Sequence, residues 1–485
     1  MSSSPPTSAP SARRRRVLIA VGLVLVIALI AGGIGVSLAV RKHPSAAGKP
    51  NIVFILTDDQ RWDTLKYMPN VKRLLADRGV TFANSFVVNP LCCPSRASIL
   101  TGDYSHTTGE WWNAPPWGGF PKFHNDHSTI ATWLHDAGYR TALFGKYLNQ
   151  YQGTTYVPPG WDHWVALDGS QNRNDYYYRY YLNVDGHLAY HGASPKDYST
   201  NVLADAAVSY IRNTPGTLFT YFAPYGPHQP STPAPGDGAA FAGIKPWRPP
   251  SYNQPDLSAE PPWVQKLHPM GSKRRKATDL LRQHMLESLL SEDRAVARIV
   301  AALAATGRLH DTMIVFASDN GFSWGEHRWH DKITPWEENI RVPLVVRYDP
   351  LTGTPRTDRH VVANIDYAPT FAQLAGVDAP GAEGMSFLPL LQGRTVTWRT
   401  YIGIEGMGRP TGKRIPAFCG VRTSRYALTD YGDGGRELFD LSSDPYELSN
   451  LAAKPAQASL VAQLDAQIRR LCNPPPPTSP KGFPP

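Results

Sequence analysis

Cysteine is scarce in this sequence, with four residues among 485. Two of them, Cys92 and Cys93, are adjacent and stand directly before Pro-Ser-Arg. A zinc site needs spaced cysteines with further Cys or His partners, which are absent near this pair. A disulfide between adjacent cysteines is disfavoured because it strains the backbone. The pair is therefore either two inert buried thiols or includes a nucleophilic thiol whose pKa is lowered by Arg96.

Acidic residues are absent from residues 1–49, which hold seven Lys or Arg. Removing these seven from the 49 basic residues of the chain leaves 42 basic against 40 acidic residues, so the formal charge of +9 belongs mainly to the N-terminal segment. A nucleic-acid-binding surface requires basic residues clustered on a folded face. The internal basic run at residues 273–276 is expected to be a solvated loop. The charge distribution therefore argues against a nucleic-acid partner.

Charged residues are also absent from residues 17–40, a run of 24 that follows four arginines at 13–16. A membrane-spanning helix needs roughly 20 apolar residues, whereas the apolar part of a signal peptide has about 7–15. We therefore expect a disordered basic N-terminus at 1–16, a transmembrane signal anchor at 17–40 and a linker at 41–50, with the arginines cytoplasmic and the rest of the chain outside. The alternative is secretion after cleavage near Ser45-Ala46-Ala47. Outside the cytoplasm, Cys419 and Cys472 are candidates for a disulfide.

Short apolar runs alternate with helical patterns between residues 51 and 395. The expected strands lie at 51–56, 141–145, 218–224, 313–321 and 342–348, and the expected helices at 70–78, 128–138, 277–307 and 365–376. This alternation predicts an α/β domain with a mostly parallel sheet flanked by helices. After about residue 395 the pattern changes to an antiparallel meander and a closing helix. We therefore expect a smaller α+β subdomain at 396–472, followed by a Pro-rich tail at 473–485.

Polar residues follow four of the expected strands. Asp58-Asp59, Lys146, His228 and Asp319-Asn320 each come shortly after an apolar run. Ligands of open α/β sheets bind at the carboxyl ends of the strands, so these residues are expected to form one site. Three carboxylates and an amide oxygen suit a hard cation such as Ca²⁺ or Mg²⁺. His228 and Lys146 are candidates for proton transfer and for binding an anionic substrate.

The stretch CCPSRASILTG, which begins at Cys92, resembles the signature of the type I sulfatases. In that family the first cysteine is oxidised by a separate formylglycine-generating enzyme to Cα-formylglycine. Further family landmarks occur in the same order: NIVFILTDDQ, GYRTALFGKYLNQY, SDNG followed by GEHRWHDK, and ELFDLSSDPYELSNL. The sequence is most similar to the branch that contains N-acetylglucosamine-6-sulfatase and the extracellular heparan-6-sulfatases.

The resemblance implies an alkaline-phosphatase-like fold at 51–395 and a specific role for each residue of the site. It assigns one divalent cation, Ca²⁺ or alternatively Mg²⁺, to Asp58, Asp59, Cys92, Asp319 and Asn320. A hydroxyl of the hydrated aldehyde at Cys92 would attack sulfur, and the second hydroxyl would allow sulfate to be eliminated. Arg96 would position this group, Lys146 and Lys332 would bind sulfate oxygens, and His228 or a nearby lysine would give a proton to the leaving alcohol.

One position departs from the pattern of many arylsulfatases. Their histidine two residues after the motif lysine is replaced here by Leu148, which leaves His106 and His327 as candidates for the base in sulfate elimination. The implied substrates are sulfated sugars similar to N-acetylglucosamine-6-sulfate, or aryl sulfates. Two alternatives stay open: a phosphodiesterase or phosphonate monoester hydrolase of the same superfamily, and a non-catalytic binder of sulfated glycans. The second would be expected to lack a metal ligand.

Overall fold

The computed structural model describes residue 1 and residues 48–169, 175–409 and 415–477. The basic segment expected at 1–16, the transmembrane anchor at 17–40 and most of the linker at 41–50 fall outside these residues, as does most of the tail at 473–485. Within the described part of the chain, no helix has both the length and the apolar character required to cross a bilayer.

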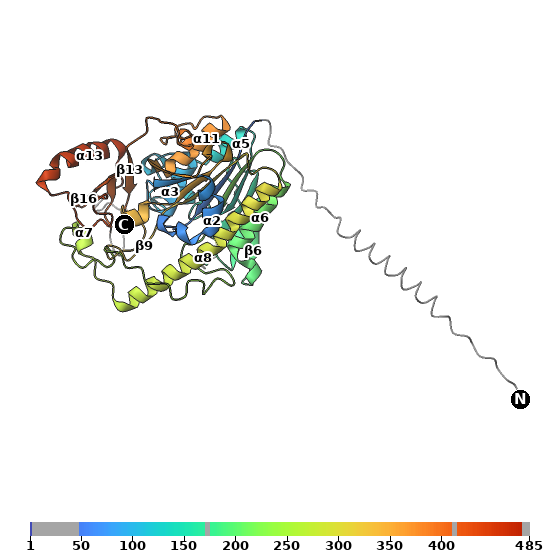
Figure 1. Ribbon diagram of the computed structural model, residues 1–485, viewed down its shortest axis with the longest axis horizontal. Coiled ribbons are helices and arrows are strands. Elements are labelled where there is room, and N and C mark those ends of the chain that lie inside the picture. Colours follow the sequence, from blue (N-terminus) through green and yellow to red (C-terminus); the bar gives the residue numbers. More distant parts are fainter. Residues whose placement is uncertain (2–47, 170–174, 410–414, 478–485) are drawn as a thin grey trace. The chain divides into compact units, whose positions relative to one another are not determined.

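A ten-stranded mixed sheet forms the centre of the described chain (Figure 1). Its strand order is β12-β2-β11-β8-β1-β7-β3-β4-β5-β6. The strands are β1 (Asn51–Thr57), β2 (Val80–Phe86), β3 (Arg140–Gly145), β4 (His163–Asp168), β5 (Tyr180–Val184), β6 (His187–His191), β7 (Leu218–Ala223), β8 (Thr312–Ser318), β11 (Leu344–Arg347) and β12 (Arg356–Ala363). The five neighbours β8, β1, β7, β3 and β4 run parallel, which confirms the α/β prediction and brings their carboxyl ends to one edge.

Strand β11 runs antiparallel to its neighbours β8 and β2, unlike the parallel strands beside them. The reason lies in the connection between β8 and β11. It holds a two-stranded ribbon, β9 (Ser323–Trp324) and β10 (His330–Asp331), and one short helix, α9 (Glu337–Ile340), with no long crossover helix. The chain therefore re-enters the sheet from the edge at which β8 left it, and residues 319–343 stay at that edge.

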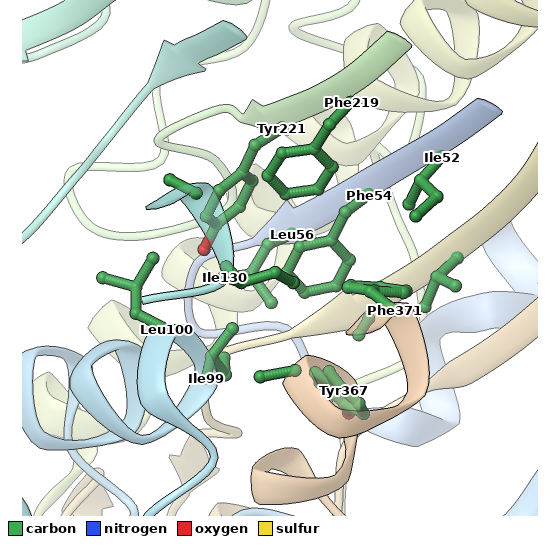
Figure 2. Packing of buried hydrophobic residues seen from close by; sticks show 14 of the residues in the cluster. Ile52, Phe54, Leu56, Ile99, Leu100, Ile130, Phe219, Tyr221, Tyr367 and Phe371 are labelled. Atoms are coloured by element: carbon green, nitrogen blue, oxygen red, sulfur yellow. The ribbon is translucent and has the colours of Figure 1, made fainter. Parts of the chain in front are cut away.

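Alternate residues of β1 face two different helical layers, because successive side chains of a strand point to opposite faces. Ile52, Phe54 and Leu56 pack in one cluster with residues of α3 (Cys92–Thr101), α5 (Ile130–Asp136) and α11 (Tyr367–Ala375), as Figure 2 shows. Val53 and Ile55 pack on the other face, against α2 (Pro69–Leu74), α6 (Ser199–Asn213) and α8 (Ser272–Ala305). Both faces of the strand are buried, which explains its uninterrupted apolar sequence.

Several further helices of the described chain are short. They are α4 (Ser105–Thr108), α7 (Pro262–Gln265), α10 (Asp349–Thr352) and α12 (Leu388–Leu391), together with the 3₁₀ turns η1 (Trp62–Tyr67), η2 (Ala76–Arg78), η3 (Phe120–Lys122), η4 (Pro195–Asp197), η5 (Asn364–Asp366) and η6 (Pro455–Gln457). The basic run 273–276, expected as a loop, lies in the first turn of α8 with its residues exposed.

A separate four-stranded antiparallel sheet follows in the C-terminal part, in the order β13 (Tyr401–Gly406), β14 (Phe418–Thr423), β15 (Tyr426–Tyr431) and β16 (Arg436–Asp440). The closing helix α13 (Ala458–Leu471) packs its buried Val461, Leu464 and Ile468 in one cluster with residues of this sheet. Cys419 in β14 forms a disulfide with Cys472, directly after α13, with the two Cα atoms 6.4 Å apart. The meander, the closing helix and the candidate disulfide of the sequence analysis are thus present.

Candidate active site

Cys92 is the first residue of helix α3, and its side chain is buried completely. Leu91 before it is extended, and Gly102 ends the helix with a φ of 84°, a left-handed conformation that glycine adopts without strain. Every residue of α3 is buried. The burial of a whole helix, not only of one stripe, explains why its sequence has no amphipathic pattern. It also fixes the position of Cys92 from all sides.

The two polar pairs that follow β1 and β8 lie against each other, as expected for neighbouring parallel strands. The backbone N–H of Asp59 donates to Oδ1 of Asp319 at 3.1 Å, and Nδ2 of Asn320 donates to Oδ1 of Asp59 at 2.6 Å. Asp58 is buried beside them, and its Oδ1 lies 3.6 Å from Sγ of Cys92. Asp59 has a φ of 63°, which turns the chain sharply at the end of the strand.

Three cations surround these carboxylates. Arg96, one turn along α3, donates through Nε to Asp319 at 2.7 Å and through its terminal nitrogen to Asp58 at 3.3 Å. The Nζ of Lys146, just after β3, donates to Oδ2 of Asp58. The Nζ of Lys332 lies 2.6 Å from Oδ1 of Asp59 and 2.6 Å from Sγ of Cys92.

The ionisation of the cluster follows from this pairing. Burial acts to raise the pKa of Asp58, but Lys146, His228 and Arg96 outweigh it and hold the pKa below its ordinary value. Burial acts to lower the pKa of Lys332 and of Lys146, and the carboxylates overcome it so that both values are raised. Asp58 is therefore ionised and both lysines are charged at neutral pH.

Cys92 itself is not an activated thiol. Burial raises its pKa to about 12 in spite of the two lysines, and the nearby carboxylates Asp58 and Asp319 act in the same direction. The hypothesis that Arg96 lowers this pKa is wrong, because the guanidinium is bound to Asp58, to Asp319 and to the carbonyl oxygen of Lys146. An unmodified Cys92 would therefore be a poor nucleophile at neutral pH.

Cys93 points to a different partner. Its Sγ lies 3.3 Å from Oε2 of Glu110, its backbone N–H donates to Asn113, and burial raises its pKa well above the ordinary value. Glu110 also accepts the backbone N–H of Gly119. The two adjacent cysteines thus face different surroundings, which the sequence alone does not reveal.

His228 closes the cluster on its outer side. Its Nε2 lies 3.6 Å from Oδ2 of Asp59, and its Nδ1 lies 2.7 Å from the carbonyl oxygen of Gln229. A carbonyl accepts only, so Nδ1 carries a proton in this arrangement. Burial lowers the pKa of His228, and the positive charge of Lys332 acts in the same direction. Its side chain is still 23% exposed, which leaves it accessible from a cavity.

A cavity of about 660 Å³ opens beside Lys146 and His228. Its polar lining includes Asn149, which lies in the motif GYRTALFGKYLNQY, and Asn113, Gln152 and Tyr176, which no quoted motif contains. Leu148, the residue that replaces the usual histidine, also lines this cavity. The cavity and the charged cluster together form the candidate active site.

The two histidines proposed as elimination bases have partners of their own. His106 lies 2.8 Å from Glu405 and 3.6 Å from Glu383, and these contacts raise its pKa to about 10 against the effect of burial. His327 is fully buried, stacks on Trp336 and lies 3.1 Å from Gln254. Neither contacts Cys92 in the described structure, whereas His228 lies beside Asp59.

The donor atoms of the site suit a divalent cation. Asp58, Asp59, Cys92 and His228 each offer a ligand atom within 4.8 Å of the others, and Asp319 and Asn320 lie directly beside Asp59. Oδ1 of Asn320 is buried without a hydrogen-bond partner in the described structure. A buried oxygen without a donor is costly, and a hard cation would satisfy it.

Comparisons with known proteins agree with this geometry. The family model described as Sulfatase matches residues 50–377, and the model described as N-sulphoglucosamine sulphohydrolase, C-terminal, matches residues 325–473. The human N-acetylglucosamine-6-sulfatase is 31% identical over 93% of this chain and 88% of its own length. The extracellular sulfatase SULF-1 homolog of Drosophila melanogaster is 35% identical over 74% of this chain, which spans only 33% of that protein.

Solved structures show the same fold. A protein in complex with its substrate D-glucosamine-2-N,6-O-disulfate superposes with a TM-score of 0.75 at 26% identity, covering 87% of this chain and 97% of the other. The phosphonate monoester hydrolase of Silicibacter pomeroyi superposes with a TM-score of 0.69 at 24% identity, covering 87% and 95% of the two chains. At that level of identity the second similarity extends to the fold alone.

Proposed function

This chain belongs to the sulfatase family and is a sulfuric ester hydrolase, and we propose that it removes sulfate from a sugar of the 6-O-sulfated glucosamine type. The observation that carries the proposal is the position of Cys92. It lies at the start of a buried helix, in contact with Lys332 and next to Asp58, and the cavity opens beside Lys146 and His228. The names of the relatives support the choice of sugar.

We propose that Cys92 is converted to formylglycine by a formylglycine-generating enzyme before it acts. The raised pKa of the thiol supports this, because an unmodified Cys92 would supply little thiolate. The hydrated aldehyde would supply two hydroxyl groups, one for attack on sulfur and one for the later release of sulfate. Pro94, Ser95 and Arg96 would belong to the motif that the modifying enzyme reads.

We propose Ca²⁺ as the cation of the site. Asp58, Asp59, Asp319 and Asn320 would hold it, with the modified side chain of Cys92 as a further ligand, because these groups offer mainly hard oxygen donors. When bound, the cation supplies positive charge that stabilises the anionic reacting group. Mg²⁺ is the alternative.

The remaining roles follow from the contacts. Lys146 and Lys332 would bind the sulfate oxygens, because each carries a fixed positive charge at the inner end of the site. Arg96 is a positioning residue, since it bridges Asp58 and Asp319. Lys146 or His228 would give a proton to the leaving alcohol oxygen, because both line the cavity. His228 would first take up a proton at Nε2, since burial lowers its pKa and its Nδ1 proton is directed to Gln229.

We propose that the chain acts outside the cytoplasm, held to the membrane by residues 17–40, with a secreted form as the alternative. The uncharged run of 24 residues after four arginines supports the anchor. The relatives that are named extracellular support the location of the catalytic part, and the disulfide between Cys419 and Cys472 is typical of an exported protein.

The test compares substrates on formylglycine-bearing protein. N-acetylglucosamine-6-sulfate, other sulfated monosaccharides, p-nitrophenyl sulfate and a matched phosphonate monoester are assayed side by side. We expect the highest kcat/KM on the 6-sulfated sugar. A preference for the phosphonate ester would establish the alternative activity instead, and an active preparation in which mass spectrometry finds Cys92 wholly unmodified would refute the proposed nucleophile.

A further inference from the structure

A second group of possible ligand atoms lies in the described chain, formed by His327, Glu338 and Glu447. One ring nitrogen of His327 and one carboxylate oxygen of each glutamate lie within 4.8 Å of one another. The exposed fractions of the three residues are 0%, 5% and 2%. None of the three takes part in the hydrolysis as proposed above. His327 and Glu338 belong to the connection between β8 and β11, and Glu447 follows β16 in the C-terminal part.

His327 is prepared as a ligand through one nitrogen. Its Nδ1 lies 3.1 Å from Oε1 of Gln254, an amide oxygen that can only accept, so Nδ1 carries the proton. The lone pair then resides on Nε2, which is buried and has no hydrogen-bond partner in the described structure. Histidines that bind metals commonly donate their other N–H to a carbonyl group, which fixes the tautomer and the ring orientation.

The basic residues near the two glutamates form their salt bridges with other carboxylates, although the charge of Arg61 acts on Glu338 from a distance. Arg61 pairs with Glu326 and Asp63, and Arg422 and Arg341 pair with Glu337. Neither Glu338 nor Glu447 has a salt bridge among the residues that the structure describes, and Oε2 of Glu338 has no hydrogen-bond partner there. Glu447 is held in place by the backbone N–H of Glu337 at 3.0 Å. A buried carboxylate without a cation is costly.

We propose that His327, Glu338 and Glu447 bind a divalent transition metal, with Zn²⁺ as the best match. Imidazole nitrogen together with carboxylate oxygen favours Zn²⁺ over Ca²⁺, which prefers oxygen ligands only. Metal–ligand distances of about 2.0–2.2 Å place tetrahedral donor atoms about 3.4 Å apart, so small side-chain movements close the site. A neighbouring cavity of about 340 Å³, lined by Glu338, Arg422 and Tyr446 among others, gives a route of entry.

The metal would join two parts of the chain. His327 lies five residues before Lys332, whose Nζ contacts Cys92, and Glu447 lies beyond the four-stranded sheet. A bond from the metal to each would fix the connection that carries Lys332 against the C-terminal part. The metal would therefore stabilise the structure. We expect its loss to lower the melting temperature more than it lowers the rate of hydrolysis.

The experiment measures zinc on the full-length protein after incubation with Zn²⁺ and dialysis against excess Ca²⁺, which competes for the active site. Wild type is compared with Glu447→Gln, with Asp319→Asn in the active site, and with Glu287→Gln, a control at another fully buried glutamate. We expect one equivalent of zinc by elemental analysis in wild type, Asp319→Asn and Glu287→Gln, and loss of at least about tenfold in zinc affinity in Glu447→Gln.

Anomalous diffraction at the zinc edge on wild-type crystals provides a readout that needs no variant. A peak within bonding distance of Nε2 of His327 and of both carboxylates would establish the site. Absence of zinc from this position in crystals soaked with Zn²⁺ would overturn the proposal. So would a folded Glu447→Gln protein, checked by circular dichroism, that retains the full equivalent. Activity on sulfate esters is measured separately, so failure of the zinc site is distinguishable from failure of the proposed hydrolysis.

Discussion

The two buried clusters of this protein are built from similar residues but are balanced differently. In the active site, each carboxylate contacts a protein cation: Asp58 contacts Lys146 and Arg96, Asp59 contacts Lys332, and Asp319 contacts Arg96. In the second cluster, Glu338 and Glu447 have no such partner in the described structure, and His327 is neutral because burial lowers its pKa to about 3. The first cluster therefore consists of ion pairs, whereas burial raises the pKa of both glutamates of the second, so that protons neutralise them until a metal binds.

The comparison also shows how backbone geometry serves both clusters. Asp59, His327 and Glu447 all have positive φ values, at 63°, 49° and 53°, which is uncommon for residues other than glycine. Such conformations cost free energy and persist only where the surroundings hold them. In each cluster, the residues with positive φ values place a possible ligand atom close to the ligand atoms of the other members.

The largest expected effect separates the adjacent cysteines at the active site. Cys92→Ala should lower kcat by at least about 10³-fold, since it removes the proposed precursor of the nucleophile. Cys93→Ala should leave kcat within about threefold and lower the free energy of unfolding by about 1 kcal/mol, because Glu110 keeps its contact with Gly119. Steady-state kinetics and urea denaturation check both, and equal losses of kcat would contradict the assignment.

Lys332 tests whether the fixed cations of the first cluster act on the substrate. Lys332→Ala should lower kcat/KM by about 10²–10³-fold, because a charge at the sulfate oxygens is lost. Lys72→Ala is the matched control, since this exposed lysine pairs with Asp77 on the surface and should change nothing measurable. Circular dichroism confirms folding of both variants. If Lys332→Ala loses activity only at temperatures at which the variant unfolds, the role of Lys332 would be structural instead.

Removal of the proposed Ca²⁺ tests the contrast between the two clusters. In protein prepared without zinc, dialysis against EGTA should reduce kcat at least about 10²-fold, because the reacting group loses the positive charge of the cation, and adding Ca²⁺ back should restore kcat. The melting temperature should fall by less than about 2 °C, since Arg96, Lys146 and Lys332 still compensate the carboxylates. Glu447→Gln should show the reverse pattern, with the melting temperature falling further than the activity. Scanning calorimetry and rate assays on the same samples decide between these outcomes.

The smallest expected effect concerns a histidine with the opposite environment to His327. Although burial opposes its charge, hydrogen bonds to Glu383 and Glu405 raise the pKa of His106 to about 10 from an unfolded value of 6.5. A raised pKa stabilises the folded state fully below about pH 6.5, and this contribution is lost as the pH rises towards 10.

Between pH 7 and pH 10, the free energy of unfolding should therefore fall by about 2 kcal/mol more in wild type than in His106→Gln, after allowance for partial solvent screening. Urea denaturation at several pH values measures the difference. Parallel pH profiles for the two proteins would show that His106 is not charged in the folded state.

The residues that follow the strands could be read from the sequence because a parallel sheet brings carboxyl ends together. Asp58, Asp59, Asp319 and Asn320 were expected in one place for this reason. Asp59 contacts Asp319 and Asn320, and Arg96 bridges Asp58 to Asp319. The antiparallel direction of β11 could not be read in the same way, because its apolar residues suit either direction. The different partners of Cys92 and Cys93 could not be predicted from the sequence either, since helix α3 is buried on all sides and its sequence has no amphipathic periodicity.

By itself, the sequence determined the α/β class, the order of the strands and helices that carry the site, and the residue types available at the sheet edge, because apolar periodicity and local motifs are properties of short segments. Only the tertiary structure decided which charges pair. It brought Lys332 to Cys92 across 240 residues and Glu447 to Glu337 across 110. Those contacts join distant segments, and burial then sets the pKa values that short-range patterns cannot supply.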